Sequence, residues 1–289
     1  MERDEDREAL PEPPPPGGVL WSISGDIRTV MMLPAALTMQ VARPAVGAGV
    51  DAYSVFRTDP WGRLERSVES VLRWVYDGEE AAEEGRRLRR LHRSIKGTDA
   101  YGRDYHSLMP QHYAWVHATG FPVFRHAMPY LWREITPEQE RRLYAEWLRV
   151  GRVLGINDRD MPQTIEEFWP YYEKQLAEEA EPTLVVRELT DVTRYLPPPD
   201  RGPAPFRLAA KLLWPWLMPR VASLMRFGII GLMPPEARRA LDLEWTEHQE
   251  RKLRRLGAVT RTVVPLLPAR LRFMPRARRA RAAHPEIYG

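Results

Sequence analysis

Cysteine is absent from this chain of 289 residues. Its absence excludes disulfide bonds, zinc sites with thiolate ligands, iron–sulfur clusters and haem held by a thiolate. A bound metal must therefore use the seven histidines or the carboxylates. Lysine is scarce as well, with 4 residues against 39 arginines, so the net charge of +4 is weak evidence for a nucleic-acid partner. We expect none.

Several functional motifs are also missing. The sequence has no G-x-G-x-x-G loop, no Walker loop, no G-x-S-x-G elbow and no H-E-x-x-H zinc helix. Nucleotide binding and serine hydrolase chemistry are therefore not expected. No apolar run is long enough to span a bilayer, and the N-terminus shows no positive and apolar segments of a signal peptide. These patterns predict a cytoplasmic protein.

Composition divides the chain into a body and two charged ends. Residues 1–18 hold six acidic residues and a run of four prolines, which predicts a disordered tail. Residues 276–289 are expected to form a basic tail. The stretch Arg270–Arg281 has six arginines and no acid, which is typical of a solvated end; contact with phosphate or anionic lipid is the alternative.

The body, residues 19–275, is expected to be one all-α domain, because no run of alternating apolar and polar residues predicts a strand. Its core should cover about 25–180, followed by a C-terminal helical section at 206–275. Local signals mark two helices within the core. Thr136 and Gln139 form a capping box for a helix that ends at Gly155, and Thr164 with Glu167 begins another.

Short apolar runs fill Leu212–Leu232, interrupted by Arg220 and Arg226. They are too short to cross a membrane. We expect a buried helical hairpin here. A surface facing a membrane or a lipophilic substrate is the alternative.

One histidine lies within an apolar helical pattern. In RLRRLHRSIKG (87–97), Leu88, Leu91, His92 and Ile95 are spaced at i, i+3, i+4 and i+7, so they share one helix face. Such a histidine is either a hydrogen-bonded core residue or a ligand of haem iron, for which imidazole is a common donor. Spacing alone leaves both open.

Two other segments place polar side chains beside apolar ones. In the helix pattern of residues 59–76, Arg63 lies one turn before Ser67 at the edge of the apolar face. Arg66 lies further around the helix, away from that face. A solvated, arginine-rich helix is the simpler interpretation. In YAWVHAT (113–119), an inward-facing His117 precedes the hydroxyl of Thr119.

Taken together, these segments resemble the catalytic domain of the MpaB/rubber oxygenase (latex clearing protein) family over residues 25 to about 180. The C-terminal LRRLGAVTRTVVPLLPARLRFMP is also similar to the usual ending of the family. The matching stretches, in order, are ALTMQVARPAVGAGV (36–50), DPWGRLERS (59–67), LHRSIKG (91–97), GRDY (102–105), WVHAT (115–119) and YAEWLRVGRVLGI (144–156).

The resemblance implies a globin-like helical core around haem b (iron protoporphyrin IX). It assigns the proximal iron ligand to His92, with the basic Lys96 nearby. In rubber oxygenases an arginine, a lysine and a threonine of one earlier helix lie on the distal side. These positions map onto Arg63, Arg66 and Ser67, of which the last two are substituted here. Arginine does not readily deprotonate, so a base at position 66 is not expected.

The same resemblance leaves alternatives for the other side chains. His117 is the second candidate ligand; otherwise it lies on the substrate side or behind the haem, together with Thr119. Tyr53 stands where relatives often have histidine, and rubber oxygenases are typically exported, which this N-terminus does not predict.

The function implied is a haem-dependent oxygenase or oxidase that uses O2 on a small apolar organic molecule. Cleavage of a carbon–carbon double bond, hydroxylation and dehydrogenation are all compatible with it. The rival interpretations are a non-catalytic helical binding protein with peripheral membrane contact, and a non-haem iron site built from His92, His117 and Glu146.

Overall fold

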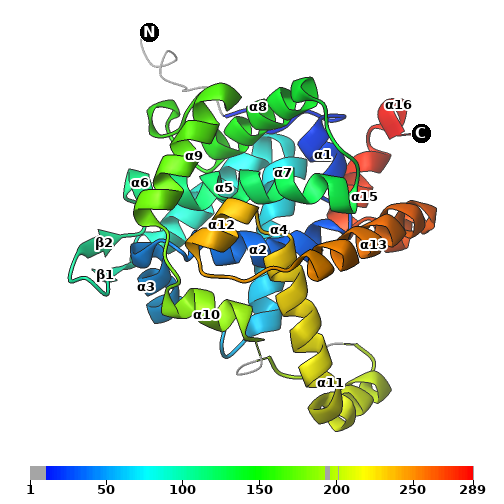
Figure 1. Ribbon diagram of the computed structural model, residues 1–289. Coiled ribbons are helices and arrows are strands. Elements are labelled where there is room, and N and C mark those ends of the chain that lie inside the picture. Colours follow the sequence, from blue (N-terminus) through cyan, green and yellow to red (C-terminus); the bar gives the residue numbers. More distant parts are fainter. Residues whose placement is uncertain (1–10, 193–195, 201, 289) are drawn as a thin grey trace.

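Helices make up nearly all the regular structure in this computed structural model, which describes residues 11–192, 196–200 and 202–288 (Figure 1). The all-α fold is confirmed. The α-helices are α1 (Val19–Ile23), α2 (Thr29–Gln40), α3 (Pro44–Tyr53), α4 (Pro60–Tyr76), α5 (Ala81–His92), α6 (Pro110–Ala118), α7 (Gly120–Leu131), α8 (Pro137–Val153), α9 (Ile165–Glu179), α10 (Leu184–Thr190), α11 (Ala204–Gly231), α12 (Pro235–Ala240), α13 (Glu247–Val263), α14 (Ala269–Arg272), α15 (Pro275–Ala282) and α16 (Pro285–Tyr288).

A hydrophobic core joins α2, α6, α7, α8 and α9. Its centre is aromatic: Phe121 lies 5.0 Å from Tyr144 and 5.1 Å from Phe168 between ring centroids, in edge-to-face contacts. Trp115 of α6 is fully buried and donates its indole N–H to the carbonyl oxygen of Gln40. Such contacts bury large apolar areas and stabilise the domain.

The two predicted helix starts are confirmed. Thr136 and Gln139 form the reciprocal capping box of α8, and Thr164 accepts the backbone N–H of Glu167 at the start of α9. These bonds satisfy N–H groups that have no partner within the helix. Helix α8 ends at Val153, and Gly155 follows with φ +78°, a conformation that glycine adopts readily.

Helices α4 and α5 form an antiparallel pair that carries most of the predicted site residues. Asp59 caps α4 by accepting the N–H of Gly62, and Pro60 begins the helix. Gly85 lets α5 approach α8 closely, since a Cβ there would lie 1.9 Å from the carbonyl oxygen of Val153.

The end of α5 differs from the prediction. The helix stops at His92, and a small antiparallel hairpin follows, β1 (Lys96–Thr98) and β2 (Asp104–His106). Ile95 therefore leaves the helical register, and Leu91 is 59% exposed rather than core-facing. The predicted apolar stripe is wrong in these two positions: Leu91 faces solvent within α5, and Ile95 lies after the end of the helix.

The apolar section 212–232 is also not a buried hairpin. Residues 212–231 belong to α11, a helix that contains Pro215 and Pro219 and that leaves the body of the molecule and bends along its length (Figure 1). Leu212 is 67% exposed and Trp216 is 75% exposed. Among the described residues, no helix is long and apolar enough to cross a membrane.

The two ends of the chain are more ordered than their composition predicts. Residues 1–10 lie outside the described residues, but 11–18 make defined contacts: Glu12 pairs with Arg149 at 3.3 Å, and the N–H of Gly17 donates to the hydroxyl of Tyr288. At the C-terminus, α15 docks on the body rather than remaining solvated. The guanidinium of Arg276 binds the carboxylates of Glu69 and Asp77.

Candidate functional site

His92 is the last residue of α5, and its ring is half-buried. Its Nδ1 lies 2.7 Å from the carbonyl oxygen of Leu88, one turn earlier. Because a carbonyl can only accept, Nδ1 carries the proton and the Nε2 lone pair is left for another partner. The ring also lies edge-on to Tyr113 of α6, with centroids 6.3 Å apart.

The imidazole of His92 is held in its neutral form. Burial lowers the pKa of His92 from its ordinary value of 6.5; the hydrogen bond to Leu88 opposes this, and the guanidinium groups of Arg63 and Arg87 lower the pKa further. A neutral imidazole at pH 7 is the form that binds a metal ion.

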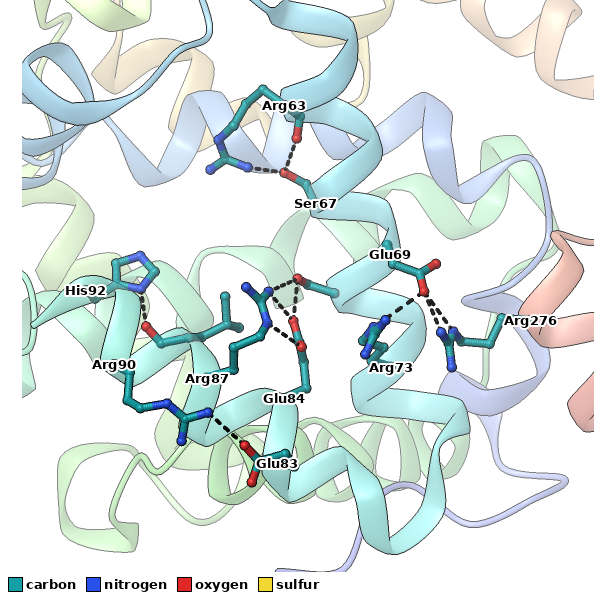
Figure 2. A network of polar contacts seen from close by, with 12 residues as sticks. Arg63, Ser67, Glu69, Arg73, Glu83, Glu84, Arg87, Arg90, His92 and Arg276 are labelled. Atoms are coloured by element: carbon teal, nitrogen blue, oxygen red, sulfur yellow. Dashed lines mark hydrogen bonds and ion pairs between the residues drawn. The ribbon is translucent and has the colours of Figure 1, made fainter.

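Arg63 and Ser67 lie on α4 and face the side of α5 that carries His92 (Figure 2). The guanidinium of Arg63 donates to the hydroxyl of Ser67, which in turn donates to the Arg63 carbonyl oxygen at 3.0 Å. The two side chains, which lie one helical turn apart, therefore contact each other. This contact fixes the direction of the arginine toward the region next to His92.

The charge of Arg63 has no acidic partner among the described residues. Burial is the main cause that lowers the pKa of this guanidinium, and the neighbouring Arg66 adds to the effect. A guanidinium withdrawn from water without a counter-charge is costly. This side chain therefore favours an anionic or strongly polar ligand in front of it.

Arg66 and Lys96 do not join this group. Arg66 is an exposed side chain that binds the carboxylate of Asp59 at 3.0 Å. Lys96 lies on β1 with its side chain exposed, and its carbonyl oxygen accepts the hydroxyl of Tyr53. The structure thus separates them from the pair formed by Arg63 and Ser67.

His117 and Thr119 lie in the core between α6 and α8. The His117 ring stacks on Trp147, with centroids 5.1 Å apart, and its Nε2 donates to the Trp147 carbonyl oxygen at 2.9 Å. Burial lowers the pKa of His117 to about 4. Thr119 is fully buried, and its hydroxyl donates to the carbonyl oxygen of Trp115. Both polar groups are thus satisfied by the backbone.

The three-ligand iron alternative is wrong. Glu146 accepts the N–H groups of Val19 at 2.9 Å and Leu20 at 2.6 Å, so its carboxylate caps the start of α1. Within the part of the chain that the structure describes, no three histidine, aspartate or glutamate side chains come together to hold a metal ion. His92, His117 and Glu146 therefore form no common site.

A polar network between α4 and α5 was not found from the sequence. Ser70 donates to Glu84 at 2.7 Å, and Arg87 binds both oxygens of the same carboxylate (Figure 2). Ser70 and Glu84 are 7% and 4% exposed. The i, i+3 spacing of Glu84 and Arg87 was the available signal. The network fixes α5, and with it His92, against the helix that carries Arg63.

Two cavities lie outside this pair of helices. The larger, of about 490 Å³, is lined by residues of α10 together with Arg226 and Leu241–Leu243. The smaller, of about 60 Å³, lies beside Arg89 and Tyr113. Tyr113 thus both lines the small cavity and contacts the ring of His92.

Comparison with known families decides the relationship of the chain. The family described as "ER-bound oxygenase mpaB/B'/Rubber oxygenase, catalytic domain" matches residues 21–262. The chain belongs to this family. Membership in the mpaB/rubber oxygenase family confirms the resemblance and supports oxygenase chemistry. The match covers all the predicted site residues, which lie on α4, α5, β1 and α6 and at Thr119, directly after α6.

Two mycobacterial proteins are similar over most of the chain. They are the uncharacterized proteins Rv2237 of Mycobacterium tuberculosis and Mb2261 of Mycobacterium bovis, each 27% identical over 255 residues. The alignment covers 83% of this chain and 91% of each relative. No solved structure matches this mpaB/rubber oxygenase family member.

Proposed function

We propose that this protein is a haem b-dependent oxygenase that acts on a small apolar organic molecule. One observation carries the proposal: the neutral imidazole of His92 has its Nδ1 engaged by Leu88, which leaves Nε2 free to bind iron on the side facing Arg63. A metal-bound histidine almost always donates its other ring N–H in this way, and the bond fixes both tautomer and orientation.

The residues around His92 fit a haem in their chemistry. His92 would hold the iron, and Arg63 would face an anionic or polar group, which its unpaired guanidinium favours. When bound, the haem would supply the activation of O2. The protein's own residues would do the rest: Ser67 orients Arg63, and the Glu84 network keeps α4 and α5 in place.

His92 is favoured over His117 as the ligand for a structural reason. The Nε2 of His117 already donates to the Trp147 carbonyl oxygen, and its ring is stacked inside the core. Binding iron there would require the helix pair α6–α8 to repack. Lys96, with Thr119, is not assigned a role toward the cofactor in this proposal.

An apolar substrate and O2 follow from the family, whose description names oxygenases. Because Ser67 and Arg66 replace the threonine and lysine of the rubber oxygenases, Arg63 is the polar group that we assign to the oxygen side. Cleavage of a double bond, hydroxylation and dehydrogenation are the candidate reactions. The cytoplasmic location remains a prediction.

The test is spectroscopic and catalytic together. The full chain, expressed with added haem precursor, should purify with a Soret band and should consume O2 when supplied with unsaturated hydrocarbons. Protein that folds but carries no Soret band, and gains none on incubation with haemin, would remove the haem from the proposal. It would then favour the rival, a helical binding protein without catalytic activity.

A further inference from the structure

Helix α11 carries a large apolar surface that points away from the body of the protein. Phe206, Leu213, Leu217 and Leu224, spaced by seven, four and seven residues, share one side of the helix. A second row, spaced by four residues, lies next to it. We call the whole set the α11 apolar face; its members are Phe206, Leu208, Leu212, Leu213, Trp216, Leu217 and Leu224, each at least 42% exposed.

The opposite side of α11 explains why the helix is nevertheless held in place. Trp214 and Met218 pack with Val192, Leu196 and other residues in a small apolar cluster separate from the main core. The indole N–H of Trp214 also donates to the Leu196 carbonyl oxygen at 3.1 Å. The helix is thus anchored by this stripe and by its C-terminal end, where Ile229 and Ile230 are buried. The α11 apolar face lies outside both contacts.

The charges on α11 are all of one sign. Ala204–Gly231 contains Arg207, Lys211, Arg220 and Arg226 and no acidic residue. Arg207, Lys211 and Arg220 are exposed and flank the apolar residues. Long cationic side chains around an apolar helix face, with a tryptophan among them, complement a surface that is apolar inside and anionic at its rim.

We propose that the α11 apolar face lies in the headgroup region of a membrane that contains anionic lipid. The apolar side chains would enter the boundary between headgroups and acyl chains, and the cations would bind lipid phosphates. Such a helix lies in the plane of the interface and does not cross the bilayer, in agreement with the absence of a spanning helix among the described residues.

A second copy of the chain fits this surface less well. Two copies of α11 packed face to face would bring the cations of one helix against those of the other, with no acid on either helix to offset them. Anionic lipid supplies the opposite charge.

The experiment is co-sedimentation of the full chain with vesicles. One set is phosphatidylcholine alone, and the other contains phosphatidylglycerol as a minor component. We expect binding to the anionic vesicles and a marked loss of binding at high salt. Leu212→Asp should weaken binding roughly tenfold or more. Its control is Leu266→Asp, the same change at a leucine that is 80% exposed outside α11, which should bind like the wild type.

A second matched pair of variants tests whether the positive charge on α11 contributes to vesicle binding. Lys211→Gln should weaken binding roughly fivefold, whereas Lys174→Gln, an exposed lysine on α9, should have no effect. Circular dichroism checks that each variant is folded.

The proposal is overturned if wild-type protein stays in the supernatant, if both vesicle types bind equally, or if Leu212→Asp binds as well as Leu266→Asp. Sedimentation velocity tests the alternative that a second copy of the chain occupies the α11 apolar face. A dimer that Leu212→Asp dissociates, in protein that ignores vesicles, would assign the α11 apolar face to a second copy instead.

Discussion

His92 and Leu88 are one turn apart on α5, and the imidazole Nδ1 of His92 donates a hydrogen bond of 2.7 Å to the Leu88 carbonyl oxygen. The acceptor belongs to the preceding turn of the same helix, whose last residue is His92. The ring at the helix terminus therefore has one nitrogen oriented by the backbone and the other available.

Gly85→Ala tests how closely α5 must approach α8. The new Cβ would lie 1.9 Å from the Val153 carbonyl oxygen, so one of the two backbones must move. We expect a loss of about 1–3 kcal/mol in the free energy of unfolding, measured by urea denaturation. Gly228→Ala is the control, since its Cβ meets nothing within 4 Å. It should be neutral or slightly stabilising. Equal effects of the two changes would contradict the close approach.

Arg63→Ala tests the assignment of the unpaired guanidinium. We expect the variant to retain its haem, to oxidise faster to the ferric state and to lose O2-dependent turnover roughly tenfold or more. Arg66→Ala, which removes only an exposed ion pair, should be close to wild type in all three.

Two results for Arg63→Ala would change the account. Loss of haem would place Arg63 against a propionate rather than on the oxygen side. Normal haem content, normal autoxidation and unchanged turnover would leave Arg63 as a solvated arginine with no role in the site.

The core histidine His117 predicts a pH dependence of stability. Its pKa is about 4 in the folded protein because of burial, against an ordinary value of 6.5. Between these values the unfolded chain binds more protons than the folded one, so the free energy of unfolding falls as the pH falls through this window. From pH 7 to pH 5 this group should contribute a loss of roughly 2 kcal/mol.

His117→Gln is the variant that isolates this contribution. Glutamine keeps a donor for the Trp147 carbonyl oxygen and does not titrate. Denaturation curves at pH 7 and pH 5 should show a smaller loss in the variant than in the wild type. An identical loss in both proteins would assign the acid sensitivity to other groups.

What the sequence predicted correctly was encoded locally. The capping box of α8 and the Thr164 cap of α9 depend on residues three positions apart, and the proximity of Arg63 and Ser67 depends on one helical turn. Such signals need no knowledge of the tertiary structure. The neutral state of the His92 imidazole could not be predicted from local signals, because it depends on burial against other helices.

The wrong predictions concern contacts between distant segments. The arginines of α15 looked like a solvated tail because Glu69, the partner of Arg276, lies 207 residues earlier in the chain. The apolar run in α11 looked like core because composition does not tell which side of a helix meets the body. The globin-like arrangement around a haem remains a prediction.

The most direct test of the central claim is haem content in two single variants. His92→Ala and His117→Ala are purified under identical conditions, and haem per chain is measured from the Soret band and the pyridine haemochrome spectrum. The account predicts that His92→Ala is nearly free of haem while His117→Ala, if folded by circular dichroism, keeps most of it. Haem retained in His92→Ala and lost from folded His117→Ala would contradict the account and move the ligand to α6.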